Sequence, residues 1–147
     1  MKNNNLEFRL QTVLNVVEHQ ENVLKNDLFK IRQQKNEEEN LLMVLYDEKE
    51  NAVYENSITQ RANVCDFQVN VSFINSISNK IETQEKKIEE ILTQESSTRG
   101  KLVDKRKSKH MLEILQKTHE EKIQKEQDIK LQKTIDELAI SKRGLVK

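Results

Sequence analysis

The chain has 147 residues, of which 34% are charged and 4% aromatic, and it contains two glycines and no proline or tryptophan. Because glycine and proline end helices and form turns, this composition excludes most compact globular folds and favours long helices. The apolar content is too low for a deep core but is sufficient for one narrow seam between helices. The 25 basic and 25 acidic residues cancel, so no global field directs the protein towards nucleic acid or an acidic membrane.

A heptad repeat predicts the first helix, over about residues 5–55. Steps of four and three residues from Leu10 visit thirteen positions, of which nine are apolar, as expected for a helix that packs knobs into holes against another helix. Asn4 and Glu7 have the spacing of an N-cap and its reciprocal partner, which places the helix start near residue 5. The repeat comprises Leu10, Leu14, Val17, Glu21, Leu24, Leu28, Ile31, Lys35, Glu38, Leu42, Leu45, Lys49 and Ala52.

The repeat stops after Tyr54, and a cluster of polar residues predicts a turn over about residues 56–68. From residue 67 to 73, apolar and polar residues alternate with period two, which is typical of a strand, although we expect the start of a helix. Heptad spacing returns at Ile74 and predicts a second helix over about residues 69–143. Gly100 is a weak point within that helix, where bending is easier than a complete break.

These elements predict an all-α fold in which residues 1–147 form one antiparallel coiled-coil hairpin. A turn centred near residues 62 and 63 places residue i opposite residue 125 minus i, so Leu10 faces Leu115 and Leu14 faces Met111. Residues 1–68 carry a net charge of −4 and residues 69–147 carry +4, which favours pairing within one chain and a monomer.

The second helix is the longer one, so its end should extend beyond the first helix from about residue 119. Apolar residues become sparse after Gln116 and return at Leu131, Ile135 and Leu138. This stripe has no partner in a monomer, so we expect a partner-binding segment near the C-terminus. The alternative is that the overhang frays or dimerises.

Catalytic and metal-binding patterns are lacking in the sequence, which predicts a protein that is not an enzyme and needs no cofactor or metal. The three histidines do not have the spacing of metal ligands, and Cys65 has no neighbouring histidine to activate it. The basic stretch 99–109 contains no aromatic residue, so solvation or an acidic protein surface is favoured over nucleic acid. No apolar run is long enough to span a membrane, and a cytosolic location is expected.

Three segments resemble the flagellar export stalk proteins of the FliJ family. They are FRLQTVLNVVEHQENVLKNDL at residue 8, FINSISNKIETQEKKI at residue 73 and KHMLEILQKTHEEKIQKEQDIKLQKTIDELAISKR at residue 109. The resemblance covers nearly the whole chain, and its most specific parts are Phe8, Arg9 and Leu10 at the start and Asp136, Glu137 and Leu138 near the end.

The resemblance implies a non-enzymatic coupling protein of type III export, cytoplasmic and attached to the membrane only through the export apparatus. Its joined chain ends would enter the pore of the hexameric export ATPase, and its coil would contact the cytosolic domain of the membrane export gate. Export chaperones would be further partners. The implied ATPase-binding residues are Arg9, Leu10, Leu14, Leu131, Ile135 and Leu138. The implied gate-binding residues are Leu45, Phe73, Ile77 and Gln84. Phe73 and Ile77 have seam packing as an alternative role.

Other functions share this pattern. A prefoldin-like holdase chaperone is also a helical hairpin, and a strand over residues 67–73 would support it. A cytosolic coiled-coil tether or scaffold that forms a parallel dimer is a second alternative, which the charge difference between the halves disfavours. The stalk proteins of virulence injectisomes have the same architecture, and the sequence pattern does not separate them from flagellar ones.

Overall fold

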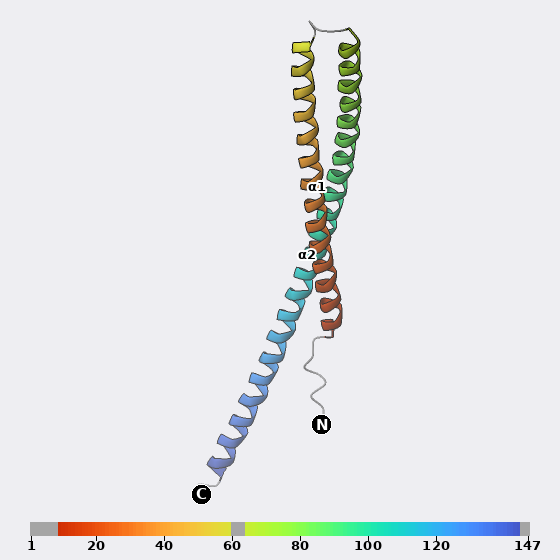
Figure 1. Cartoon of the computed structure of the whole chain (residues 1–147). Helices are drawn as coiled ribbons and strands as arrows, with labels where there is room; N and C mark the ends of the chain where they lie inside the picture. The colour runs from red at the N-terminus through yellow and green to blue at the C-terminus, as the bar shows by residue number, and fades with distance from the viewer. Residues whose placement is uncertain (1–8, 60–63, 145–147) are drawn as a thin grey trace. The chain divides into compact units, whose positions relative to one another are not determined.

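Two long helices make up nearly all of the described chain. A computed structural model describes residues 9–59 and 64–144. Helix α1 spans Gln11–Thr59, and helix α2 spans Val64–Gly144 (Figure 1). Within the described ranges there is no strand. The predicted all-α helical hairpin is therefore confirmed.

Both helices contribute to two compact units. The terminal unit contains residues 1–22 and 103–147, and the central unit contains residues 23–102. Within each unit, ion pairs and hydrogen bonds join the α1 stretch to the α2 stretch in antiparallel order. Each unit is thus a two-helix packing arrangement with one seam.

The seam of the central unit is apolar where the two helices pack most closely. Ala52 of α1 and Ile77 and Ile81 of α2 are buried and form the core cluster, with Leu42, Leu45 and Ile74 packed against it. Ile77 has only 1% of its surface exposed. Removing an aliphatic side chain of this size from water stabilises the folded chain by roughly 1.5–3 kcal/mol.

The heptad repeat of α1 is confirmed by the burial of its residues. Every predicted seam position from Leu14 to Ala52 is buried or half-buried, and only Leu10 is exposed. The four charged members of the repeat point into the seam as well, so the period of the pattern decides the direction of the side chain even where the residue is polar. On α2 the same spacing runs from Ile74 to Ile123, and all its members are buried or half-buried.

The register differs slightly from the prediction. Four cross-helix pairs fit residue i opposite residue 127 minus i, whereas Glu38 with Lys87 still fits 125 minus i. The four are Gln11 with Gln116, Glu18 with Lys109, Glu21 with Arg106, and Arg32 with Glu95. Met111 and Leu115, which were predicted to face Leu14 and Leu10, are consequently exposed. Leu112 and Gln116 take the half-buried seam positions instead. These two pairings were wrong because the turn centre was estimated from a diffuse polar cluster.

The helix boundaries also correct the prediction. Residues 56–59 and 64–68, which were assigned to the turn, are helical, whereas residues 69–73 are helical as expected. The hydroxyl of Ser57 donates to the carbonyl of Tyr54, and that of Ser72 donates to the carbonyl of Gln68. Because these serines bond to the preceding turn, they remain in the helix.

At the start of α1, residues 9 and 10 form a turn before the helix. Asn4 and Glu7, the predicted N-cap and its partner, lie outside the described residues.

Helix α2 does not break at Gly100, since one α-helix is assigned from Val64 to Gly144. A Cβ atom at this glycine would have no atom within 4 Å. The position therefore does not need glycine for a close approach to another residue.

Candidate interaction surfaces

Polar side chains form two layers in the seam of the central unit. Glu38 of α1 accepts a hydrogen bond from the Gln84 side chain and pairs with Lys87, both on α2. The Gln84 amide also donates to the backbone carbonyl of Glu38 at 3.0 Å. Lys87, and then Gln84, lower the pKa of the Glu38 carboxyl. A buried carboxylate is acceptable here because its charge and its lone pairs are satisfied by the facing helix.

The second polar layer is centred on Glu95 of α2. Arg32 lies 2.8 Å from one carboxylate oxygen and Lys35 lies 3.4 Å from the other. The hydrogen bond from Arg32 is the main cause of a lowered pKa of Glu95. Like the Glu38 layer, this one joins an acid on one helix to bases on the other.

The terminal unit has an equivalent layer at Glu21, which is buried in the seam. Arg106 Nε and Lys109 Nζ each lie 3.3 Å from a carboxylate oxygen of Glu21, and Lys109 also reaches Glu18. The bonds to Glu21 and Glu18 raise the pKa of Lys109. In all three layers, an acid on one helix therefore faces bases on the other only because the two helices pack antiparallel in this register.

We expect acid to weaken the folded chain through these layers. A carboxyl group whose folded pKa is lowered contributes stability that is present above its ordinary pKa of 4.5 and is lost as the pH falls through the folded value. The melting temperature, followed by circular dichroism, should fall as the pH is lowered from about 5 to about 3. Glu95→Gln should reduce this dependence because the side chain no longer titrates.

Glu90→Gln is the matched control, since Glu90 is exposed and has no ion pair with the described residues. It should retain the acid dependence of the unmodified chain. Equal pH profiles for the two variants would contradict a role of the Glu95 layer.

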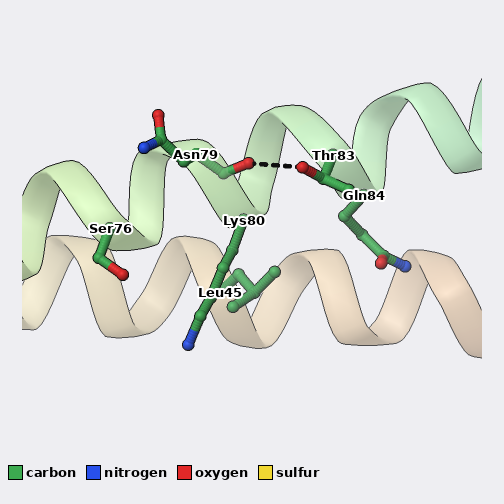
Figure 2. Close-up of a pocket in the computed structure, with 6 residues that line it drawn as sticks. All are labelled: Leu45, Ser76, Asn79, Lys80, Thr83 and Gln84. Atoms are coloured by element: carbon green, nitrogen blue, oxygen red, sulfur yellow. Dashed lines mark hydrogen bonds between the residues drawn. The ribbon is translucent and has the colours of Figure 1, made fainter.

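A shallow hollow opens between the helices in the central unit. Its volume is about 480 Å³, and it is lined by Leu45 of α1 and by Ser76, Asn79, Lys80, Thr83 and Gln84 of α2 (Figure 2). The Thr83 hydroxyl donates to the backbone carbonyl of Asn79 at 2.9 Å. The lining thus comes from one aliphatic residue of α1 and five polar residues of α2, and apolar atoms make up most of its surface.

The four residues implied for gate binding have different environments. Leu45 and Gln84 line the hollow, and Phe73 is 52% exposed. Ile77 belongs to the core cluster, so a partner would reach it only by opening the seam. Sequence reasoning did not single out Ser76, Asn79, Lys80 or Thr83, because these residues follow no apolar period; only the register shows that they share a hollow with Leu45.

The implied ATPase-binding residues fall into two groups within the terminal unit. Arg9 and Leu10 are exposed in the turn before α1, whereas Leu14 is buried in the seam. Leu131, Ile135 and Leu138 are all exposed, as is every residue from 124 to 144. The seam register places Leu14 near Leu112, so roughly 19 residues of helix, or about 28 Å, separate it from Leu131.

Leu131, Ile135 and Leu138, which we call the C-terminal stripe, do not continue the seam. If the seam spacing is extended beyond Ile123, it visits Lys130, Lys133 and Glu137. At about 100° per residue, the C-terminal stripe lies roughly 100° or more around the helix from that line. The stripe is therefore a separate apolar face of α2.

Metal-binding clusters and membrane-spanning helices are both lacking in residues 9–59 and 64–144. No group of three or more histidine, cysteine, aspartate or glutamate side chains is placed to hold a metal ion. No helix in these ranges is long and apolar enough to cross a membrane. Cys65 is exposed and not in a disulfide.

The family model described as "Flagellar FliJ protein" matches residues 6–143. Searches of curated proteins and of solved structures gave no match. The chain belongs to the FliJ family, and it is therefore a flagellar export-associated protein of a family involved in flagellum biogenesis and type III export. The family is a non-enzymatic component of flagellar export.

Proposed function

We propose that this chain is a stalk of the flagellar export apparatus that binds the hexameric export ATPase and raises its activity. The C-terminal stripe carries the proposal, because it is an apolar face on an exposed helix that the seam does not use. Three aliphatic residues at heptad spacing are the usual means by which a helix attaches to another protein. The family membership supports the ATPase as the protein that is bound.

A rod in a ring can change turnover only if it binds the ring subunits unequally in their different states. The C-terminal stripe occupies one side of α2, while charged residues occupy the line that continues the seam. A one-sided contact of this kind meets one region of a ring at a time. The proposed mechanism is thus differential binding of ATPase conformations rather than chemistry on the stalk.

The hollow and Phe73 are the proposed contact for the cytosolic domain of the membrane export gate. Phe73 supplies an exposed aromatic ring, and Leu45 and Gln84 lie in the hollow on the same unit. Export chaperones are further proposed partners. A cytoplasmic protein held at the membrane by its partners fits these contacts.

The proposed ATPase contact is tested by the turnover of the purified cognate ATPase with and without this chain. The unmodified chain should raise turnover and co-sediment with the hexamer. Ile135→Lys should lose most of both effects, since a lysine ammonium would have to be desolvated in an apolar contact.

Ile140→Lys is the control, because Ile140 is 71% exposed on the same segment but lies outside the C-terminal stripe. It should behave like the unmodified chain. No stimulation and no co-sedimentation with the unmodified chain would refute the ATPase role, and equal losses in both variants would refute the contact through the stripe.

A further inference from the structure

Three lysines beside the seam have carboxylate partners, whereas Lys49, Lys105 and Lys80 have none among the described residues. Lys87 pairs with Glu38, Lys35 pairs with Glu95, and Lys109 pairs with Glu18 and Glu21. Lys80, in contrast, has no ion pair or hydrogen bond with any described residue. It lines a hollow of about 480 Å³ in which its ammonium group can be approached from solvent.

The heptad repeat explains why Lys80 has no partner. Lys80 lies seven residues before Lys87, so it occupies the same position of the repeat on α2. The acid that pairs with Lys87 is Glu38, and the residue seven positions after Glu38 on α1 is Leu45. The coil therefore places a leucine where the equivalent layer has a carboxylate, and Leu45 and Lys80 line the hollow together (Figure 2).

A second unused hydrogen-bond donor borders the same space. The Ser76 hydroxyl bonds to no described residue and lines the hollow with Lys80, whereas the Asn79 side-chain amide points away from Leu45 and Lys80 (Figure 2). An ammonium and a hydroxyl are together suited to a carboxylate, which accepts several hydrogen bonds and carries the opposite charge. Leu45 contributes an apolar wall that would lower the local polarity and strengthen such a bond.

We propose that the hollow binds an aspartate or glutamate side chain of the protein that docks on this surface, and that this carboxylate pairs with Lys80 as Glu38 pairs with Lys87. The inference rests on the proposed gate contact, and it adds the chemistry that the partner must present. The exposed ring of Phe73, two helical turns from Lys80 on α2, then serves as an apolar anchor beside the ion pair. A partner segment with an acidic residue next to an apolar one fits both features.

The test measures binding of the purified cytosolic domain of the cognate gate protein to the full-length chain by titration calorimetry. Lys80→Met keeps an apolar stem and removes the charge, so it should weaken binding about tenfold, as expected for a lost charge-assisted hydrogen bond. Binding of the unmodified chain should also weaken with added salt more steeply than that of the variant.

Lys101→Met is the matched control. Lys101 is exposed on α2 of the same unit, three heptads after Lys80, and has no ion pair with the described residues. This control should bind like the unmodified chain. If Lys80→Met and Lys101→Met both bind as tightly as the unmodified chain, the gate contact stands and the carboxylate inference is refuted.

A charge exchange provides the second measurement. Lys80→Glu should nearly abolish binding, and changing one acidic residue of the gate domain to lysine should restore it. If no single Asp→Lys or Glu→Lys change in the gate domain restores binding, the inference is wrong. A gate domain that does not bind the unmodified chain at all refutes both the gate contact and the inference built on it.

Discussion

Ile77→Ala should destabilise the chain by about 2–5 kcal/mol, the range for removing a fully buried aliphatic side chain. Ile77 is the most completely buried of the described residues and belongs to the core shared by both helices. The two helices present only one layer of side chains to each other, so few neighbours are available to fill the cavity. The measurement is the midpoint of urea unfolding followed by circular dichroism.

Phe73→Ala is the comparison for this variant, because Phe73 is four residues away on the same helix and half exposed. It should cost markedly less stability than Ile77→Ala, and its effect should appear in partner binding instead. A similar stability loss for both variants would contradict the assignment of Ile77 to the core. The two residues, which the resemblance groups as one gate site, would thus be separated by experiment.

Replacing the four charged seam residues of α1 by leucine should change the oligomeric state. In a parallel pair of identical helices each seam residue meets its own copy, so Glu21, Lys35, Glu38 and Lys49 would each face a like charge. In the antiparallel hairpin, Glu21, Lys35 and Glu38 find opposite charges on α2. The quadruple variant removes the repulsion, and light scattering should detect dimers or larger species in place of the expected 17.4 kDa monomer.

The stability of this quadruple variant should stay the same or fall, because the substitutions remove only the α1 member of each ion pair and leave Lys109, Glu95 and Lys87 on α2 without that partner. A control with Lys30, Glu37 and Glu39 changed to glutamine removes charges from exposed positions of α1 and should remain monomeric. A monomeric quadruple variant would show that the charged layers do not control self-association.

The seam was predictable from the sequence because its residues recur along the chain at regular steps of four and three. Each step of four or three residues returns to the same side of the helix. Glu21 and Glu38 lie at such positions and are buried in the seam although they are charged. The turn was less predictable, because serines near the helix ends satisfy their hydroxyls on preceding carbonyls and do not stop the helix. Because the turn centre was predicted wrongly, the predicted register was shifted. Met111 and Leu115 were therefore predicted to lie in the seam, whereas they are exposed.

The candidate surfaces were predictable to different degrees. The C-terminal stripe could be found in the sequence, since three apolar residues follow a polar stretch. The hollow could not, because its main feature is that Lys80 bonds to no described residue, and that is visible only once the contacts across the seam are known. The helical conformation of residues 67–73 also removes the strand that would have supported a prefoldin-like chaperone.

The location of the C-terminal stripe has a consequence for affinity. A binding face that shared residues with the seam would be available only in the small fraction of molecules whose helices had separated, and the measured affinity would fall by that fraction. Leu131, Ile135 and Leu138 are exposed while the seam of the terminal unit is closed. If the stripe is the contact, as proposed, every folded molecule is competent to bind, and no part of the binding free energy is spent on opening the hairpin.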